Sequence, residues 1–375
     1  MNKRGDLMRK LLLKTVLVMM LICSLVACNK KDTKDAQQST NKTVEKKPSL
    51  DTTSYNNFNL EESTLIEDYK VALLSQTDEK NNIYTSAQTG LQRLKDRLDC
   101  EIVFEEYTED DFSDKVSSLI DSDCKMIWVL GDKASDINTV AVEYPEVNFA
   151  VVDEYYEEIE DNVILINIKM AEASFLLGYV AGLATNTNVV AIEYVKDNTS
   201  DEYVYGFKAG VDYSARETRK EIAVEIVEIA DATNIEDVKA QTTALYDKNC
   251  DVVYAANKDI ESAVAETTMN TDKMVILLSE SMSLLAPNNT LTYPVKYVDS
   301  AVELVSFHAM SGNDIAGVAY EYGISEGALD ISNNYVNVSS VIDSQIGSLK
   351  ELIIGGAFVI PSDEVSYQEY LASFE

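Results

Sequence analysis

The chain alternates short apolar runs with segments in which apolar residues recur at every third or fourth position. The runs at residues 70–75, 163–168 and 189–193 are too continuously apolar for half-exposed antiparallel strands, so they predict buried strands of a parallel sheet. At residues 84–98 the apolar spacing is that of a helix that buries one face. This alternation, repeated along the chain, predicts an α/β fold.

One strand, helix, strand unit occurs twice. The stretch 121–154 has its counterpart at 247–280, and Cys124 and Cys250, the apolar runs that follow them and the two terminal glutamates keep this register without a gap. Two such units predict two similar α/β lobes, and a gap between two lobes is where a small molecule is usually held. The alternative is that βαβ units are common enough to resemble one another by chance.

The segment at 171–184 is apolar on all sides and is expected to form a helix buried on all sides. Gly178 and Gly182 have a spacing also found at membrane dimerisation faces, but fourteen residues are too few to span a bilayer, so we expect close packing in the core. Further expected elements are a helix at 298–310 that packs back on the first lobe, paired short strands within 317–331, a helix at 341–354 and a last strand at 357–361.

These elements predict two doubly wound parallel-sheet lobes joined by a multi-strand hinge. The expected boundaries are residues 1–27 for a signal peptide, 28–68 for a flexible tether, 69–168 with about 294–314 for the first lobe, 169–293 with about 315–361 for the second lobe, and 362–375 for a C-terminal segment. The tether is expected because residues 29–68 show almost no apolar pattern and cannot bury enough surface to offset the entropy of ordering.

The first 28 residues are typical of a lipoprotein signal. A basic head precedes a short apolar core, which is shorter than the roughly 20 residues of a membrane span. The core ends in Leu25-Val26-Ala27-Cys28, which resembles a bacterial lipobox, so we expect cleavage before Cys28 and lipidation of its thiol. An ordinary cleaved signal with an incidental cysteine is the alternative.

The chain is strongly acidic, with a formal net charge of −33. Removal of residues 1–27 leaves 26 Lys+Arg against 63 Asp+Glu, a net charge of −37. Such a surface repels nucleic acid and anionic lipid headgroups, so we expect no nucleic-acid partner and contact with the membrane through the lipid anchor. A strongly anionic ligand is also disfavoured.

The cysteines predict free thiols rather than a disulfide scaffold. Cys100 and Cys124 precede two strands that, in the usual doubly wound order, flank the first strand and lie roughly 9 to 10 Å apart. A disulfide requires Cα atoms within about 7 Å. We therefore expect Cys100, Cys124 and Cys250 to be free.

Several segments in this order resemble the basic membrane protein family. They are residues 148–153 (Asn-Phe-Ala-Val-Val-Asp), 173–182, 206–210 (Gly-Phe-Lys-Ala-Gly), 322–329 and 354–361. The resemblance covers about residues 70–361 and implies a type I periplasmic-binding-protein fold. It also implies a lipoprotein receptor of an ABC transporter, with purine-nucleoside receptors as the model for the family.

The resemblance also implies ligand contacts. Asp153, Phe207 and Lys296 match the family, and Asp78 stands for its aspartate after the first strand. Other positions differ from the family: Tyr84 follows Ile83 where an Asn preceded by Phe is usual, residues 255–259 replace a glycine-rich turn, and Ser279, with Glu280 beside it, replaces a ribose-binding aspartate. The usual purine-nucleoside contacts are therefore only partly present.

The usual position of ligand sites in parallel sheets selects candidate residues independently of the family resemblance, since ligands meet the loops after the carboxyl ends of strands. Those loops contain Gln76, Asp78, Gly131, Asp132, Asp153, Glu154, Lys196, Asn257, Ser279 and Glu280. Carboxylates accept sugar hydroxyls and rings stack on bases, and the candidate rings are Tyr84, Tyr155, Phe207 and Tyr297. The expected ligand-binding set is Asp78, Tyr84, Asp132, Asp153, Phe207, Asn257, Ser279, Glu280 and Lys296.

Each of these residues also has a purely structural interpretation. A carboxylate can be an exposed loop charge in a chain full of them, Phe207 can be a core residue of its helix, and Lys296 can pair with an acidic neighbour. Catalysis has little support, because the single histidine, His308, lies in an apolar helical run and is read as a packed or capped residue. We expect no enzyme activity, no cofactor and no metal site.

The pattern as a whole predicts a lipid-anchored, extracytoplasmic solute-binding protein. Its lobes would close on a small polar ligand, a nucleoside or a related sugar-bearing molecule, and hand it to an ABC permease and ATPase. The alternative is a surface ligand sensor on the same fold, with a degenerate site and no transport role.

Overall fold

The computed structural model describes residues 44–51, 65–77, 82–332, 337–357 and 359–374. These residues belong to one compact unit, Thr43–Glu375. Cys28 and Asp78, predicted as the lipidation site and as a ligand residue, lie outside the described residues. Within the described residues, no helix is both long and apolar enough to cross a membrane.

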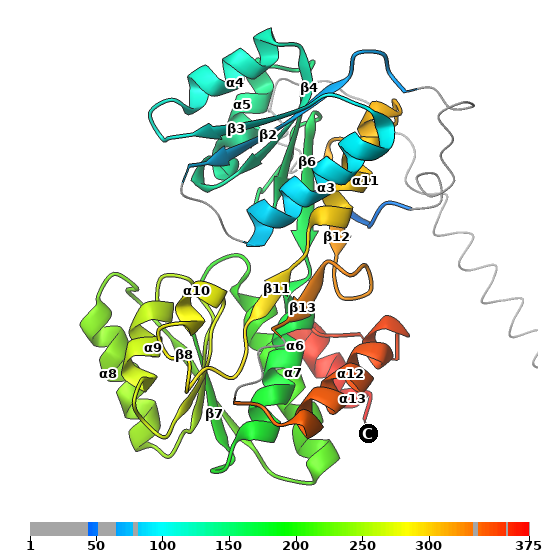
Figure 1. The fold of residues 1–375 in the computed structure, drawn as a ribbon. Coiled ribbons are helices and arrows are strands. Elements are labelled where there is room, and N and C mark those ends of the chain that lie inside the picture. The colour runs from blue at the N-terminus through cyan, green and yellow to red at the C-terminus, as the bar shows by residue number, and fades with distance from the viewer. Residues whose placement is uncertain (1–43, 52–64, 78–81, 333–336, 358, 375) are drawn as a thin grey trace, which may run out of the picture. The chain divides into compact units, whose positions relative to one another are not determined.

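The first lobe is built on a parallel sheet with the order β1-β12-β6-β5-β4-β2-β3 (Figure 1). Its strands are β1 (Lys46–Pro48), β2 (Lys70–Gln76), β3 (Ile102–Tyr107), β4 (Cys124–Leu130), β5 (Asn148–Val152), β6 (Val163–Ile168) and β12 (Val318–Tyr322). Its helices are α3 (Asn82–Leu98), α4 (Phe112–Asp121), η1 (Asp132–Asp136), α5 (Ile137–Glu143) and α11 (Asp299–Met310).

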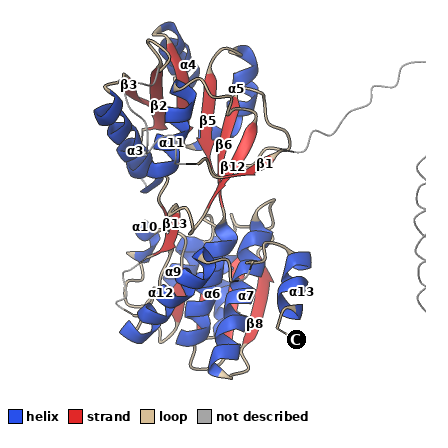
Figure 2. Cartoon of the chain, turned by 90° about the vertical axis from the view of Figure 1, so that its right-hand side faces the viewer, coloured by secondary structure: helices blue, strands red, loops and turns tan. Residues whose placement is uncertain are grey.

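Helices cover both faces of this sheet, which explains why its strands are continuously apolar (Figures 1 and 2). Successive residues of β2 point to opposite faces: Leu73 belongs to the core cluster that contains residues of α3 and α11, and Leu74 to the cluster that contains residues of α4 and α5. Because α11 packs against α3, the helix expected at 298–310 does return to the first lobe.

The second lobe has a parallel sheet with the order β10-β9-β7-β8. Its strands are β7 (Val189–Tyr194), β8 (Ala223–Glu228), β9 (Val252–Ala255) and β10 (Met274–Ile276). Its helices are α6 (Met170–Ala184), α7 (Ser200–Thr218), α8 (Ile235–Asp247), α9 (Glu261–Thr268), α10 (Glu280–Ser283), α12 (Ser340–Ile354) and α13 (Glu364–Ala372).

The two sheets repeat one strand order, β3-β2-β4-β5 in the first lobe and β8-β7-β9-β10 in the second. The repeat extends to the backbone, since Asp123 and Asn249 occupy the same place before β4 and β9 and both have a left-handed φ, 68° and 72°. The doubly wound α/β prediction is therefore confirmed. Cys100, Cys124 and Cys250 are free, and β2 lies between β3 and β4 as expected.

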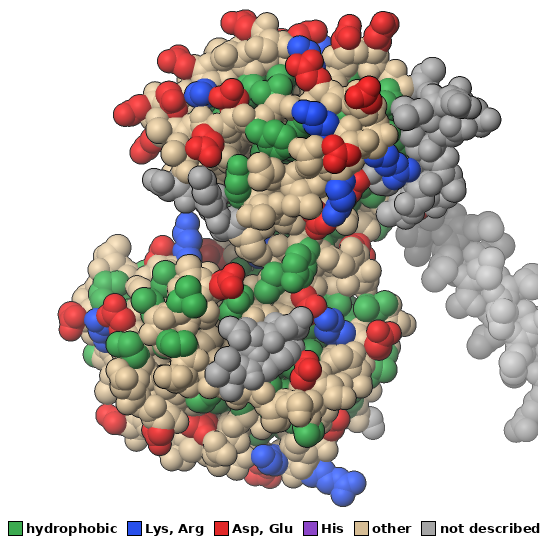
Figure 3. Space-filling model, in the orientation of Figure 1, with side chains coloured by type: hydrophobic (Ala, Val, Ile, Leu, Met, Phe, Trp, Pro, Cys, Tyr) green, Lys and Arg blue, Asp and Glu red, His purple; other side chains and the backbone are tan. Residues whose placement is uncertain are grey.

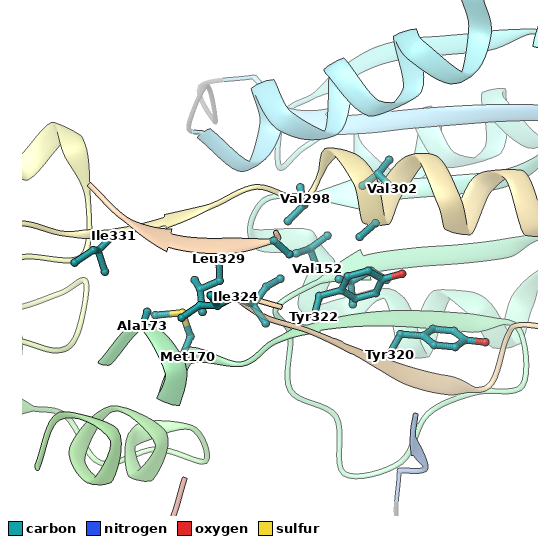
Figure 4. Close-up of a cluster of buried hydrophobic side chains, with 14 of the residues drawn as sticks. Val152, Met170, Ala173, Val298, Val302, Tyr320, Tyr322, Ile324, Leu329 and Ile331 are labelled. Atoms are coloured by element: carbon teal, nitrogen blue, oxygen red, sulfur yellow. The ribbon is translucent and has the colours of Figure 1, made fainter. Parts of the chain in front are cut away.

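In the part of the chain that the structure describes, three connections join the lobes. They are the passage from β6 into α6, that from β11 (Pro294–Lys296) into α11, and that from β12 into β13 (Leu329–Ile331). β11 and β13 pair in an antiparallel two-stranded sheet. Apolar side chains gather around these connections and continue the main core, among them Met170, Ile324 and Leu329 (Figure 4).

The structure corrects several expected boundaries. β12 lies beside β6 in the first sheet and not in the second lobe, and it does not pair with β13. Described residues 359–361 form no strand. β1 falls inside the segment expected to be a tether; three residues at a sheet edge carry no apolar pattern that the sequence could reveal. Helix α13 packs on α7, where the Tyr370 hydroxyl donates to the Ala209 carbonyl at 3.2 Å.

Candidate functional site

A cavity of about 630 Å³ lies where the carboxyl ends of strands from both sheets meet. Its wall is formed by the loops after β4 and β5 of the first lobe, the loops after β7, β9 and β10 of the second, and β11. We call it the strand-end cavity. Its polar lining includes Asn82, Asp132, Asp153, Glu154, Asp197, Thr199, Tyr203, Asn257, Lys258, Glu261, Ser279 and Lys296.

Asp153 and Lys296 form an ion pair in the wall of the strand-end cavity. Asp153 directly follows β5 and has a left-handed φ of 62°, while Lys296 ends β11. Their side chains are 25% and 18% exposed, so the pair is partly shielded from water. Two opposite charges held in this way are largely neutralised before any ligand arrives.

Glu261, in the first turn of α9, fixes the turn after β10. Its carboxylate accepts the backbone N–H of Leu278, and the backbone N–H and hydroxyl of Ser279 at 3.0 and 3.2 Å. Burial raises the pKa of Glu261, and these hydrogen bonds oppose the rise. Glu261 therefore positions Ser279 at the edge of the cavity.

Glu154 stands apart from the other carboxylates of the cavity. It is half-buried, and among the described residues it has no hydrogen-bond donor and no ion-pair partner. Burial, and then the charges of Asp153 and Asp132, raise the pKa of Glu154 to about 7, while Lys258 and Lys296 oppose the rise. A group with this pKa exchanges its proton near neutral pH.

Two other loops are held by local hydrogen bonds. The Asp197 carboxylate accepts the backbone N–H groups of Thr199 at 2.8 Å and Ser200 at 2.7 Å, so it holds the turn that leads into α7. After β4, Gly131 has a φ of 107°, and a Cβ there would lie 2.6 Å from that of Gln76. Only glycine fits this turn, which leads into Asp132.

The described residues contain no group of three or more His, Cys, Asp or Glu side chains placed to hold a metal ion. His308 lies outside the strand-end cavity, and its Nδ1 is 2.8 Å from the side-chain amide of Asn313. The chemistry of the cavity is thus that of carboxylates, amides, hydroxyls and two lysines, which bind polar groups by hydrogen bonds and charge.

Comparison with known protein families identifies the kind of protein that carries this cavity. The sequence model of one family, described as "ABC transporter substrate-binding protein PnrA-like", matches residues 73–364. This chain belongs to the Bmp family. Its members are substrate-binding proteins of ABC transporters. The resemblance of the sequence segments to the basic membrane protein family is thereby confirmed.

Relatives of this Bmp-family protein span most of its length. Basic membrane protein A of Borreliella afzelii is 25% identical over 313 residues, which cover 81% of this chain and 95% of the relative. The CD4+ T-cell-stimulating antigen of Listeria monocytogenes is 26% identical over 321 residues, which cover 79% and 88%.

Solved structures agree on the fold. A transcriptional activator of the comK gene from Bacillus halodurans superposes with a TM-score of 0.61 at 20% identity, covering 77% of this chain and 99% of its own. An ABC transporter solute-binding protein from Conexibacter woesei gives 0.60 at 14% identity, covering 78% and 99%. At these identities the likeness shows the type I periplasmic-binding fold alone.

Five residues of the predicted ligand set line the strand-end cavity of this Bmp-family protein: Asp132, Asp153, Asn257, Ser279 and Lys296. The rule that ligands meet the carboxyl ends of strands selected the first four of these, and Glu154 as well. That they contact a ligand stays a prediction.

Three predicted residues do not line it. Phe207 is fully buried in α7, with its ring centre 5.4 Å from that of Tyr254, so it is a core residue. Tyr84 packs against the main core from the start of α3. Glu280 begins the short helix α10 and is exposed outside the cavity.

Several residues that line the cavity were not among those predicted from the sequence: Asn82, Asp197, Thr199, Tyr203, Lys258 and Glu261. Asp197 and Thr199 lie in the loop after β7, so the rule that ligands meet the carboxyl ends of strands could have selected them. It selected Lys196 of the same loop, which pairs with Asp201 at 2.5 Å. Tyr203 and Glu261 lie in the first turns of helices, where the rotation of the helix decides which side chain faces the cavity.

Proposed function

We propose that this Bmp-family protein is a lipid-anchored, extracytoplasmic solute-binding protein that encloses a small polar ligand in the strand-end cavity and delivers it to an ABC transporter. The observation that carries the proposal is the cavity itself, at the carboxyl ends of strands from two sheets that share one order over four strands. Its volume of about 630 Å³ lies within the usual range of small-molecule sites.

A nucleoside or a related sugar-bearing molecule suits the lining. Carboxylates and the Asn257 amide accept hydroxyl hydrogens, and Tyr203 contributes an aromatic ring to the wall. The surface of both lobes carries many carboxylates (Figure 3), which disfavours a strongly anionic ligand.

Closure of the lobes is supported by the way they are connected. The described residues pass between them three times, and one passage, β11, carries Lys296 into the cavity wall beside Asp153 of the first lobe. A rotation about these connections would bring the loops after β9 and β10 toward those after β4 and β5, in the manner of hinge closure.

Ligand binding is tested by thermal unfolding of the purified protein with nucleosides, sugars and amino acids. A true ligand at 100 times its Kd stabilises the folded state by about 2.7 kcal/mol. Asp153→Asn should reduce this shift because Asp153 lines the cavity. If sugars or amino acids give the shift and nucleosides do not, the nucleoside part is wrong; if no compound does, solute binding itself is contradicted.

The lipid anchor rests on the Leu25-Val26-Ala27-Cys28 motif. Cells grown with a labelled fatty acid should incorporate it into this protein, and Cys28→Ala should abolish incorporation and release the protein from the membrane fraction. Cys23→Ala, which removes a cysteine of the same apolar segment, is the matched control and should leave labelling unchanged. Labelling that survives Cys28→Ala contradicts the anchor.

A further inference from the structure

The charges that line the strand-end cavity are unequal. Among the described residues, five carboxylates and two lysines face it: Asp132, Asp153, Glu154, Asp197 and Glu261 against Lys258 and Lys296. The surplus is negative and lies within one cavity, so it acts on whatever the cavity holds.

Three of the five carboxylates already have donors within the protein. Asp153 is paired with Lys296. Glu261 accepts hydrogen bonds from the turn at Leu278 and Ser279, and Asp197 from the first residues of α7. Both oxygens of Glu261, one oxygen of Asp153 and one of Asp197 are thus engaged within the protein.

The remaining two carboxylates are Asp132 and Glu154. Asp132 is exposed, and the Gln76 amide donates to its carboxylate at 3.5 Å, which is the outer limit of a hydrogen bond. Glu154 has no donor among the described residues, although it is half-buried. A shielded carboxylate without donors is unfavourable, and a ligand that supplies them removes the cost.

A positively charged donor meets this need better than a neutral one. A ligand hydroxyl donates one hydrogen bond but leaves the repulsion between the neighbouring carboxylates in place. An ammonium or guanidinium group donates several hydrogen bonds and also offsets the charge, which makes charge-assisted bonds about twice as strong as neutral ones.

We propose that the ligand carries a positively charged nitrogen group, an ammonium or a guanidinium, and that Glu154 and Asp132 receive it. The inference rests on the proposed solute-binding function and specifies the charge class of its ligand: among sugar-bearing molecules it selects an amino sugar over a neutral nucleoside. The competing explanation is that Lys258, an exposed lysine of the β9–α9 loop in the same lining, becomes the partner of Glu154 when the lobes close.

The test uses ligand pairs that differ mainly in charge, measured by calorimetry on the full chain: L-arginine with L-citrulline, and glucosamine with N-acetylglucosamine. We expect at least one cationic member to bind tenfold or more tightly than its neutral partner. Glu154→Gln should reduce that preference at least tenfold. Glu157→Gln, the same change at an exposed carboxylate of the same loop outside the cavity, should leave it unchanged.

Lys258→Gln separates the two explanations. If the ligand brings the cation, this substitution leaves cation binding equal or tighter, whereas weaker binding shows that Lys258 is the partner and overturns the inference. Neutral ligands that bind as tightly as cationic ones, with no effect of Glu154→Gln, also overturn it while solute binding stands. If none of the four compounds binds while a nucleoside gives a shift in thermal unfolding, the inference fails and solute binding stands; if no compound binds in either test, both proposals fail.

Discussion

Gly178 of α6 lies directly against the backbone of Phe207 in α7, so that a Cβ at position 178 would stand 2.1 Å from the Phe207 carbonyl oxygen. Gly210 of α7 is placed in the same way against the carbonyl of Phe175, at 1.9 Å. The two helices therefore touch through their backbones, and their glycine spacing serves core packing, as expected from the sequence.

Gly178→Ala should destabilise the protein by about 1–3 kcal/mol, because the added methyl group cannot be accommodated without moving one helix. Urea unfolding measures the change. Gly347→Ala in α12 is the matched control: a Cβ there meets nothing within 4 Å, so the same substitution should be neutral or stabilise by about 0.5–1 kcal/mol. Equal effects at the two positions contradict the packing described here.

Glu193 of β7 should make stability depend on pH. It is fully buried, Thr242 donates to its Oε2 at 2.8 Å, and burial raises the pKa of Glu193 to about 7. Between the unfolded pKa of about 4.5 and pH 7 the folded state holds more protons than the unfolded state, so stability falls as pH rises through this window.

Glu193→Gln should therefore shrink the difference in unfolding free energy between pH 5 and pH 8, by an amount on the order of 2 kcal/mol. Gln is neutral at both pH values and keeps an acceptor for Thr242. Glu225→Gln, at an exposed carboxylate of the neighbouring strand β8, should leave the pH dependence as it is. If Glu193→Gln leaves the difference in unfolding free energy between pH 5 and pH 8 unchanged, ionising Glu193 costs the folded state no stability, which contradicts the prediction.

Glu154 should release protons when a cationic ligand binds. Its pKa of about 7 reflects burial and the carboxylates of Asp153 and Asp132, against Lys258 and Lys296. Tyr156 lies close enough for the charge of Glu154 to help raise the pKa of the Tyr156 hydroxyl. A bound cation stabilises the carboxylate form, so the pKa of Glu154 falls and a fraction of a proton leaves near pH 7.

Calorimetry in two buffers of different ionisation enthalpy counts these protons. The released fraction should be largest near pH 7 and should vanish at pH 9, where Glu154 is already ionised, and in Glu154→Gln. Proton uptake on binding, or release that persists in the variant, contradicts this assignment.

The sequence was sufficient to predict the repeated strand, helix, strand unit and part of the lining of the strand-end cavity. Asp132, Asp153 and Asn257 follow buried strands within two residues, and the carboxyl end of a parallel strand fixes where such residues lie. Tyr203 and Glu261 were missed because helix rotation decides which residue of a first turn faces the cavity. The place of β12 was missed because no local pattern shows which sheet a strand joins after crossing between lobes.

Phe207→Leu distinguishes a core residue from a ligand contact. Phe207 is fully buried beside Tyr254, so the substitution should lower the unfolding free energy by about 1 kcal/mol or more and leave the Kd of the ligand unchanged. Tyr203→Leu should weaken ligand binding in addition to any loss of stability, since Tyr203 lines the cavity and also packs against the main core. Loss of affinity in Phe207→Leu without loss of stability returns Phe207 to the ligand site.

The ion pair of Asp153 with Lys296 should appear as a coupling energy. Asp153→Asn keeps a residue that tolerates the left-handed φ of 62°, and Lys296→Met keeps the length of the side chain, so each change removes charge with little effect on the backbone. Either single variant leaves the other charge partly buried without its partner and should be destabilised, whereas the double variant removes both charges.

We therefore expect the double variant to lose less stability than the sum of the two single variants, with a coupling of about 1 kcal/mol in urea unfolding. Lys169→Met combined with Asp153→Asn is the matched control, since Lys169 is also a partly exposed lysine but pairs with Glu172 and Glu326. That combination should be additive. A coupling near zero for Asp153 and Lys296 means that the two side chains act independently in solution, and the wall of the strand-end cavity then presents two separate charges to its ligand.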